Sequence, residues 1–239
     1  MAILSLNSVS KSFGALKVTD NVSFDLHPGE ALGIIGPNGA GKSTLFNLIT
    51  GNIAPDAGTV TLDDRDVTRE PPMQRVRSGI GRSFQIPQPF GHLSVYENLL
   101  VAARFGGQIS AAEAPGFCLD ILARTGLAAV AERASGGLTL LQRKRLELAR
   151  AMATRPRVIL LDEIAGGLTD AECVQLIGTI KSIHAEGTAI IWIEHVLHAL
   201  TSVVERLMVL NFGRMLMIGA PDAVMASPEV KEIYLGIEA

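Results

Sequence analysis

Residues 36–44, GPNGAGKST, combine three glycines with a lysine and two hydroxyl residues, a pattern typical of phosphate-binding loops. Phosphate needs several hydrogen-bond donors in a small space, and backbone N–H groups supply them where glycine lacks a Cβ atom. Lys42 adds a positive charge for the outer phosphates, and the Ser43 hydroxyl suits Mg²⁺. A glycine-rich turn is the alternative, but an apolar run before the loop and a helical pattern after it favour phosphate binding.

Residues 158–163, VILLDE, place two carboxylates after four apolar residues. A buried strand that ends in an acid brings a carboxylate to the sheet edge where the phosphate loop also lies. We expect Asp162 to hold Mg²⁺, directly or through water, and Glu163 to orient and deprotonate the attacking water. Because acids often follow strands, this pattern is weak alone and becomes specific only beside the phosphate loop.

The elements around these motifs follow from two kinds of apolar pattern. Alternating apolar and polar residues, as in half-buried strands, occur at residues 3–10, 16–26 and 58–64. Apolar runs that predict fully buried strands occur at 31–36, 157–163 and 188–195, and a strand hairpin is expected at 206–219. Helical patterns occur at 42–51, over most of 94–152, and at 169–187 with Thr169 as N-cap. Strands that alternate with helices predict an α/β fold with a largely parallel sheet.

Composition excludes several classes of protein. The 239 residues carry a formal net charge of −3 without a long basic block, so nucleic acid is not an expected partner. The densest basic run, Arg143-Lys144-Arg145, is interpreted as a solvated helix face. Cys118 and Cys173 lack the spacing of metal ligands and suggest a protein of the reducing cytosol. Both are interpreted as filler side chains of the core or surface rather than as reactive groups. No apolar run reaches membrane-spanning length, and the first residues do not resemble a signal peptide.

With these motifs, the chain resembles the ATP-binding subunit of an ABC transporter along nearly its whole length. Residues 84–103, FQIPQPFGHLSVYENLLVAA, resemble the Q-loop region, with Gln85 as its glutamine. IWIEH resembles the switch stretch, with His195 as its histidine, and Phe13 in SKSFG stands where an aromatic stacks on adenine. The FQ and EH pairs and the ending VKEIYLG are most similar to branched-chain amino-acid importers.

The resemblance implies a role for each matching residue. ATP would contact Phe13 and the phosphate loop, namely Gly36, Pro37, Asn38, Gly39, Ala40, Gly41, Lys42, Ser43 and Thr44. Mg²⁺ would be held by Ser43, Gln85 and Asp162, while Glu163, His195, Gln85 and Lys42 would form the catalytic set. A core aromatic at Phe13 and a strand-end histidine bonded to a backbone carbonyl at His195 are the alternatives.

The family's signature, LSGGQ, acts on ATP held by the facing subunit, and this chain departs from it. SGGL at 135–138 looks similar, but aligning the helix QRKRLELARAM places the signature at LTLLQ, residues 138–142. Thr139 and Gln142 keep the spacing of a capping box, so the helix start is retained. Leu141 replaces a glycine, and we expect its side chain to obstruct close backbone approach to the partner's γ-phosphate. Packing of Leu141 on a helix face is the alternative.

Two more departures lie after the carboxylates. Ile164 stands where the family usually has Pro, and Thr169 where its D-loop usually has Asp or Asn. Residues for the chain's own nucleotide are therefore complete, whereas those that act across a dimer interface are altered. We expect a chain that cleaves ATP when a partner supplies a good signature but is a poor signature donor, so that both sites of a homodimer would be weak.

The expected architecture is a P-loop α/β core with an antiparallel β subdomain, residues 1–87 and 155–239, and a helical subdomain, residues 88–154. The implied function is hydrolysis of ATP, with Mg²⁺, to drive import of branched-chain amino acids or similar small polar solutes. Implied partners are a second ABC ATPase subunit of the same or a paralogous chain, a transmembrane permease and, indirectly, an extracytoplasmic solute-binding protein. The chain would lie in the cytoplasm on the inner face of the membrane.

Residues 86–100 are the candidate segment for docking to the permease, with ordinary packing within the helical subdomain as the alternative.

Three other functions remain open from the sequence. The altered signature suggests a nucleotide-binding, weakly hydrolysing half of an asymmetric pair, although Glu163 argues against complete inactivity. The ATPase of lipopolysaccharide export is also similar over the whole length. A soluble ABC ATPase that acts on DNA or ribosomes is disfavoured by the negative net charge and by the importer-like FQ and EH stretches.

Overall fold

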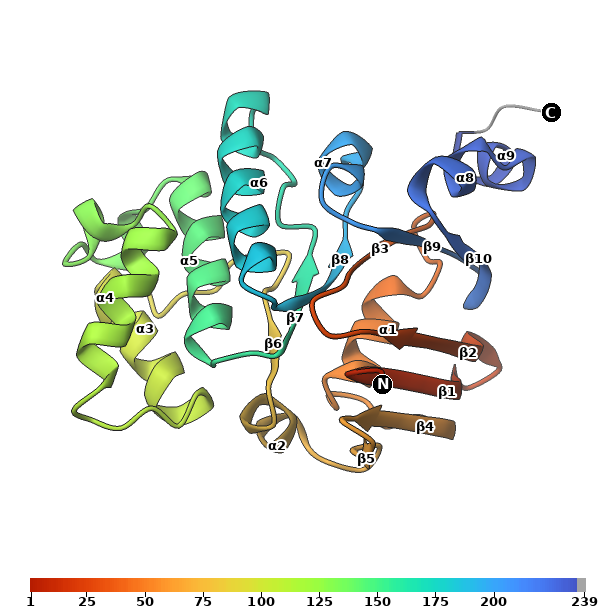
Figure 1. Cartoon of the computed structure of the whole chain (residues 1–239), viewed down its shortest axis with the longest axis horizontal. Helices are drawn as coiled ribbons and strands as arrows, with labels where there is room; N and C mark the ends of the chain where they lie inside the picture. The colour runs from red at the N-terminus through yellow and green to blue at the C-terminus, as the bar shows by residue number, and fades with distance from the viewer. Residues whose placement is uncertain (236–239) are drawn as a thin grey trace.

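A computed structural model describes residues 1–235, and Gly236 of the VKEIYLG ending lies outside them. Within the described part, one helix lies between a small sheet and a larger sheet, and other helices cover the far face of the larger sheet (Figure 1). A group of helices extends from one end of this arrangement (Figure 1). The α/β fold with an antiparallel β part and a helical part, predicted from the sequence, is confirmed.

The small sheet is antiparallel and has the strand order β2-β1-β4-β5 within the described residues. Its strands are β1 (Leu4–Phe13), β2 (Leu16–Leu26), β4 (Ala57–Leu62) and β5 (Arg65–Asp66). Along β1 and β4, buried apolar side chains such as Leu4, Leu6 and Val60 alternate with more exposed neighbours. This one-sided burial explains the alternating sequence pattern.

The larger sheet has the order β10-β9-β3-β8-β7-β6 and is parallel except at β10. Its strands are β3 (Ala31–Ile35), β6 (Ile80–Arg82), β7 (Val158–Asp162), β8 (Ala189–Ile193), β9 (Arg206–Asn211) and β10 (Arg214–Gly219). The last two form the expected hairpin, with antiparallel pairing from Arg214 opposite Asn211. Every residue of β3, β7 and β8 is buried, as their continuous apolar runs predict.

Both faces of the central strands belong to a hydrophobic core. In β8, Ile191 and Ile193 pack toward helix α1 (Lys42–Ile49) and the small sheet, whereas Ile190 and Trp192 pack toward the helices on the opposite face. Strand geometry sends successive side chains to opposite faces, so a strand covered on both sides needs apolar residues at every position. Trp192 is accordingly a core residue with a fully buried side chain.

Of the remaining helices, those within residues 94–153 and 170–185 match the predicted helical patterns. The far face of the larger sheet carries α6 (Asp170–Ala185) and α7 (Leu197–Thr201). The helical group contains α3 (Val95–Val101), the π-helical turn η1 (Ala102–Gly106), α4 (Ala114–Arg124), the 3₁₀ turns η2 (Ala128–Val130) and η3 (Ser135–Gly137), and α5 (Leu140–Ala153). The short helices α2 (Pro72–Arg77), α8 (Pro221–Ala226) and α9 (Pro228–Leu235) complete the set. Among the described residues, no helix is both long and apolar enough to cross a membrane.

Two helix starts match their predicted caps. The Thr139 hydroxyl accepts the N–H of Gln142 at 3.3 Å, and the Gln142 side chain accepts the N–H of Thr139 at 3.1 Å. Thr169 and Glu172 form the same reciprocal arrangement at the start of α6. Each capping box satisfies backbone donors that the first helical turn leaves without partners.

The parallel strands bring the motifs to one edge of the sheet. Strands β3, β6, β7 and β8 run in the same direction, so their carboxyl ends lie together. Asp162 is paired with Ile193 in the register, which sets Glu163 beside Glu194 and His195. The loop after β3 is the phosphate loop, and the loop after β6 carries Gln85. This edge is the usual ligand site of open α/β sheets.

Candidate functional site

The phosphate loop joins the end of β3 to the start of α1. Gly41 has a φ of 101°, and a β-carbon there would lie 2.4 Å from the Val18 carbonyl oxygen. A β-carbon at Gly36 would lie 2.2 Å from the Leu210 carbonyl oxygen. A side chain at either position would therefore collide with a neighbouring backbone carbonyl, whether or not the loop backbone must also approach a phosphate closely.

Lys42 lies at the start of α1 with its ammonium inside the loop. Its Nζ donates hydrogen bonds to the carbonyl oxygens of Gly36 at 2.8 Å and Pro37 at 3.1 Å. Burial lowers the pKa of Lys42, while the carboxylates of Glu163 and Asp162 act in the opposite direction. A cation held at a helix N-terminus with free backbone donors is suited to multiply charged anions.

Three side chains from three different loops meet at Glu163. The Nε2 atom of His195 lies 2.9 Å from Oε1 of Glu163, and Gln85 donates a hydrogen bond to Oε2 of the same carboxylate. The Glu163 backbone is left-handed, with a φ of 44°, directly after the end of β7. The structure therefore brings together the glutamine, carboxylate and histidine that are far apart in the sequence.

These groups share a pocket of about 650 Å³ with the phosphate loop. Its lining residues come from β2, from the start of α1 and from four loops, namely Leu16, Val18, Asn38, Gly39, Ala40, Gly41, Lys42, Ser43, Thr44, Gln85, Glu163 and His195. Phe13 is 51% exposed at the end of β1, so the alternative of a core aromatic is excluded. Its stacking on adenine stays a prediction.

Asp162 ends β7 beside the phosphate loop, but its nearest partner is a residue that the sequence analysis did not single out. Its Oδ2 atom accepts a hydrogen bond from Arg82 at 2.8 Å, in an ion pair that is nine-tenths buried. Ser43, Gln85 and Asp162 all line one hollow of about 430 Å³. Their hydroxyl, amide and carboxylate oxygens are the ligands that Mg²⁺ prefers, so the residues fit the predicted ion.

The interpretation of Arg143-Lys144-Arg145 as a solvated helix face is wrong for its central residue. Lys144 is only 4% exposed, and its Nζ donates to the backbone carbonyl oxygens of Gln85 at 2.8 Å and Glu163 at 3.1 Å. Its side chain turns inward because position 144 lies one helical turn before the buried Leu148. That spacing was the signal that could have identified it.

Glu194 is a second residue that the sequence did not single out. Its carboxylate is 1% exposed and accepts the backbone N–H groups of Ala165 and His195, both at 2.9 Å. It stands next to the candidate switch histidine, and this adjacency to His195 was the only available signal.

The apparent signature at residues 135–138 has a structural role in this fold. Ser135 is fully buried in the turn η3 and donates to the Phe90 carbonyl oxygen at 2.8 Å. Gly136 packs against Gly91, where a β-carbon at Gly136 would lie 3.1 Å from the Gly91 carbonyl oxygen. The aligned signature LTLLQ instead surrounds the start of α5, where Leu140 is 45% exposed and Leu141 is half-buried.

Comparisons with known proteins agree with this geometry. Residues 19–166 match the protein family described as ABC transporter. The chain is 36% identical over 251 residues to the high-affinity branched-chain amino acid transport ATP-binding protein LivG of Escherichia coli (strain K12), covering 98% of each chain. It is 30% identical over 236 residues to the lipopolysaccharide export system ATP-binding protein LptB of the same strain, covering 99% of this chain and 98% of LptB.

Solved structures give the same result for the fold. A nucleotide-free ATP-binding cassette from an ABC transporter has a TM-score of 0.88 and 31% identity, covering 99% of this chain and 100% of that chain. A dimeric post-hydrolysis state of an ATP-binding cassette bound to ADP and Pi has a TM-score of 0.81 and 25% identity, covering 91% of this chain and 98% of that chain.

Proposed function

The chain belongs to the ABC transporter family of ATP-binding proteins, and from this premise we propose that it hydrolyses ATP at Glu163 to power import of a small solute. Membership of the family makes the chain an ATPase and the ATP-binding subunit of a transporter. The observation that carries the proposed site is the Glu163 carboxylate, held between Gln85 and His195 in the pocket that also contains Lys42.

Each step of the hydrolysis is assigned to a group at this edge of the sheet. The phosphate-loop N–H groups and Lys42 bind the β- and γ-phosphates and offset the charge that develops on transfer. Glu163 accepts a proton from the attacking water, and Gln85 orients that water. His195 donates a hydrogen bond to the γ-phosphate, and its 2.9 Å contact with Glu163 keeps the imidazole at the pocket wall.

Ser43, Gln85 and Asp162 are the proposed ligands of Mg²⁺. A bound magnesium ion would neutralise phosphate charge and fix the phosphate orientation. Arg82 holds Asp162 in a buried ion pair and also donates to the Asn47 side chain at 2.7 Å. It therefore fixes the orientation of the Asp162 carboxylate within the hollow that Ser43 and Gln85 also line.

Import is favoured over export by the comparison with named relatives. LivG, described as a branched-chain amino acid transport protein, is more similar at 36% identity than LptB, described as a lipopolysaccharide export protein, at 30%. We assign branched-chain amino acids or similar small polar solutes as the cargo. The dimeric relative supports assembly with a second ATPase subunit, and a solute-binding protein would deliver the cargo to the permease.

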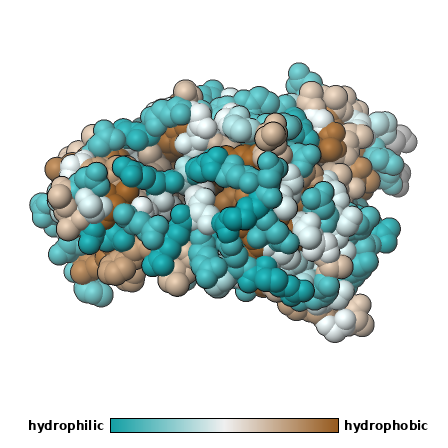
Figure 2. Space-filling view, turned by 60° about the horizontal axis from the view of Figure 1, so that its bottom comes forward, coloured by the Kyte–Doolittle hydropathy of each residue, from teal (hydrophilic) through white to brown (hydrophobic). Residues whose placement is uncertain are grey.

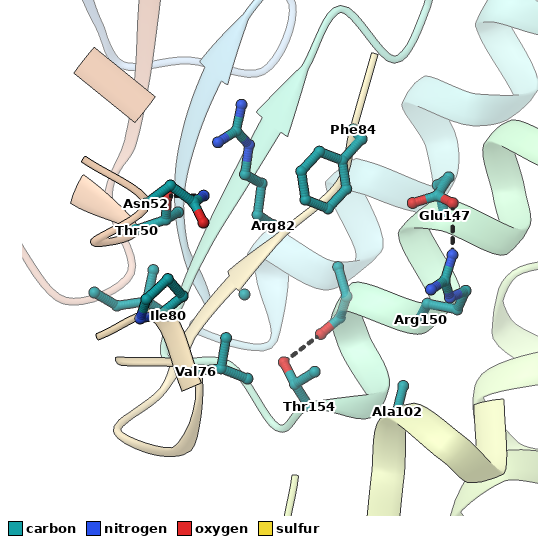
Figure 3. A pocket seen from close by; sticks show the side chains of 13 residues that line it. Thr50, Asn52, Val76, Ile80, Arg82, Phe84, Ala102, Glu147, Arg150 and Thr154 are labelled. Atoms are coloured by element: carbon teal, nitrogen blue, oxygen red, sulfur yellow. Dashed lines mark hydrogen bonds and ion pairs between the residues drawn. The ribbon is translucent and has the colours of Figure 1, made fainter. Parts of the chain in front are cut away.

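A groove between the core and α5 is the proposed docking site for the permease. It has a volume of about 210 Å³ and lies between Thr50, Asn52 and Ile80 on one side and Glu147 and Arg150 of α5 on the other (Figure 3). The lower face of the molecule is mainly hydrophilic, with hydrophobic patches sunk between polar side chains (Figure 2). Apolar residues such as Val76 and Ala102 also line the groove, and a partly apolar hollow within a polar surface suits a short protein segment.

Exposed apolar residues beside this groove support the same assignment. Phe84 lines the groove and is 50% exposed, Ile86 is 69% exposed and Phe90 is 42% exposed. Further along the predicted docking segment, Val95 and Leu99 are fully buried in the helical group. We therefore restrict the docking surface to the first part of residues 86–100, together with Phe84.

A second candidate function is the weakly hydrolysing half of an asymmetric pair. The observation that favours it is Leu140, which stands in the signature, is 45% exposed and covers the turn after Glu163. A β-carbon at Gly167 would lie 3.3 Å from Cδ2 of Leu140. Bulky side chains at 140 and 141 therefore occupy space that small signature residues leave open for a facing nucleotide.

The test is MgATP turnover by the purified chain and by its Glu163→Gln variant, with ATP affinity measured in parallel. Loss of the general base should lower turnover by about 100-fold or more, while ATP binding is retained because the phosphate loop is unchanged. Glu186→Gln removes an exposed glutamate at the end of α6 and should leave both quantities unchanged.

Two outcomes would redirect the assignment. Turnover that persists in the Glu163→Gln variant would show that another group activates the water. Tight ATP binding without turnover in the unmodified chain would favour the second candidate, in which the chain needs the signature of a paralogous partner.

A further inference from the structure

Lys144 is a buried cation behind the catalytic pocket. It lies in the second turn of α5, and its Nζ donates to the backbone carbonyl oxygens of Gln85 at 2.8 Å and Glu163 at 3.1 Å. The side chains of these two residues meet in the pocket itself. Lys144 therefore holds, from behind, the backbones that carry the catalytic glutamine and carboxylate.

The contacts of Lys144 are unusual for a lysine with only 4% exposure. Within residues 1–235 its ammonium has no ion-pair partner inside 4.0 Å, so its direct contacts are backbone carbonyls. Burial lowers the pKa of Lys144, and four carboxylates act in the opposite direction, with Glu194 first, followed by Glu163, Asp162 and Glu147. A methionine would fill the same space without the cost of burying a charge, so packing alone does not explain the lysine.

Glu194 is a buried carboxylate that also binds backbone groups next to Glu163. One carboxylate oxygen accepts the N–H of Ala165 at 2.9 Å. The other accepts the N–H of His195 at 2.9 Å and that of Val196 at 3.4 Å. With 1% exposure, this carboxylate joins the turn after Glu163 to the start of the switch segment.

We propose that Lys144 and Glu194 are positioning residues that form a backbone clamp around Glu163. Lys144 binds the carbonyls of the Gln85 loop and of Glu163, and Glu194 binds the N–H groups of Ala165 and the switch. Together they fix three segments whose side chains must meet within hydrogen-bond distance. The inference deepens the proposed function, because it names what holds the proposed catalytic groups in place.

Charged side chains suit this task because they bind backbone groups more strongly than neutral ones do. Each charged residue also matches the hydrogen-bonding type of the backbone groups that it binds. A lysine can only donate and so binds two carbonyls, whereas an ionised glutamate can only accept and so binds N–H groups. Exchanging either residue for a neutral one leaves backbone polar groups without a partner next to the reacting atoms.

The first test compares Lys144→Met and Lys144→Arg with Arg145→Met, a control on the same helix whose side chain reaches Gln175 on the exposed side. Lys144→Met should lower kcat by about 10- to 100-fold, the range expected when catalytic groups shift by about 1 Å, with the ATP dissociation constant nearly unchanged. Its Tm should fall only slightly, since the loss of two backbone hydrogen bonds is partly offset by the removal of a buried charge. Lys144→Arg should restore part of kcat, and Arg145→Met should resemble the unmodified chain.

The second test does not depend on hydrolysis. Hydrogen–deuterium exchange of the backbone amides of Ala165, His195 and Val196 reports their bonds to Glu194 directly. Glu194→Gln should speed exchange at these amides, because the amide group replaces one acceptor oxygen with a donor. Exchange in the core strand β3 should remain unchanged.

The outcomes separate the clamp from the proposed function. If the unmodified chain showed no ATP turnover but amide exchange still became faster in Glu194→Gln, the proposed hydrolysis would be wrong and the clamp would stand. Unchanged amide exchange in Glu194→Gln, or a kcat of Lys144→Met within about twofold of the unmodified chain, would overturn the clamp. If kcat and Tm of Lys144→Met both fell strongly and Lys144→Arg restored neither, Lys144 would have only a structural role.

Discussion

At the scale of single residues, Glu163 combines a strained backbone with side-chain contacts that fix its carboxylate. A left-handed conformation such as its φ of 44° costs a residue with a side chain about 1–3 kcal/mol. Its N–H compensates by donating to the Ile193 carbonyl oxygen at 2.8 Å, and His195 contacts its side chain at 2.9 Å. The turn thereby directs the carboxylate into the pocket rather than along the strand.

The two cysteines give a prediction at the same scale. Both are buried, and burial raises the pKa of the Cys118 thiol to about 11 and also raises that of Cys173. Because the thiolate is the reactive form, little of either cysteine should react with a thiol reagent at pH 7–8 in the folded protein. Timed labelling with a chromogenic disulfide should show slow reaction when folded and two thiols per chain in denaturant.

Rapid labelling of one cysteine in the folded chain would contradict this expectation. Cys118→Ala and Cys173→Ala, measured separately, would identify which thiol reacts. The prediction from sequence that both are filler side chains is confirmed as far as their position is concerned, since both belong to the large hydrophobic core.

At the scale of elements, α1 is held at its C-terminal end by an arginine from α2. Arg75 is fully buried and donates to the carbonyl oxygens of Leu48 and Ile49 at 2.7 and 2.8 Å. It also donates to the carbonyl oxygen of Thr68 at 2.8 Å. A cation at the last carbonyls of a helix satisfies acceptors that the helix leaves free and favours its dipole. The helix that starts at the phosphate loop is therefore anchored at its far end.

Replacing Arg75 by leucine should lower the free energy of unfolding by about 3–5 kcal/mol, because several buried carbonyls lose their donor at once. Urea denaturation followed by circular dichroism measures this change. Arg75→Lys should recover only part of it, since lysine lacks the planar fork of donors. Arg77→Leu, an exposed change on the same helix, is the matched control. Equal midpoints for the Arg75 and Arg77 variants would exclude the anchoring role.

At the scale of the whole molecule, we predict a complete site for the chain's own nucleotide and an altered surface for that of a facing subunit. The pocket residues gather at one edge of the larger sheet, whereas LTLLQ begins α5. The capping box of Thr139 and Gln142 keeps the start of α5 intact. We expect Leu140 and Leu141 to change only the approach to that helix end.

Leu141→Gly should therefore raise ATP turnover of a homodimer severalfold, because the backbone of α5 then becomes accessible to the facing γ-phosphate. The measurement is steady-state phosphate release as a function of protein concentration, since the effect requires two chains. Leu119→Gly, an exposed leucine in α4, controls for the general effect of glycine in a helix. Turnover that does not change in Leu141→Gly would show that this leucine is no obstacle.

Much of the site could be predicted from the sequence because its chemistry lies in contiguous segments. The phosphate loop, the two acids at the end of β7 and the helix caps at Thr139 and Thr169 depend on spacing within a few residues. The strands were evident for the same reason, since burial on one or both faces imposes a period on neighbouring positions. The division at residues 88 and 154 and the docking segment stay predictions.

Tertiary structure decided which charged residues turn inward. Lys144 meets carbonyls 59 and 19 residues away, and Arg82 meets Asp162 at a separation of 80 residues. Helical spacing to Leu148 can indicate that Lys144 turns inward, but nothing nearby in the sequence indicates the partners of Lys144 or Arg82. Whether a charge is buried depends on how distant backbone groups converge around it, and burial is tolerated only where those groups supply its hydrogen bonds. That convergence is set by the packing of the sheet against α5, beyond the reach of local periodicity.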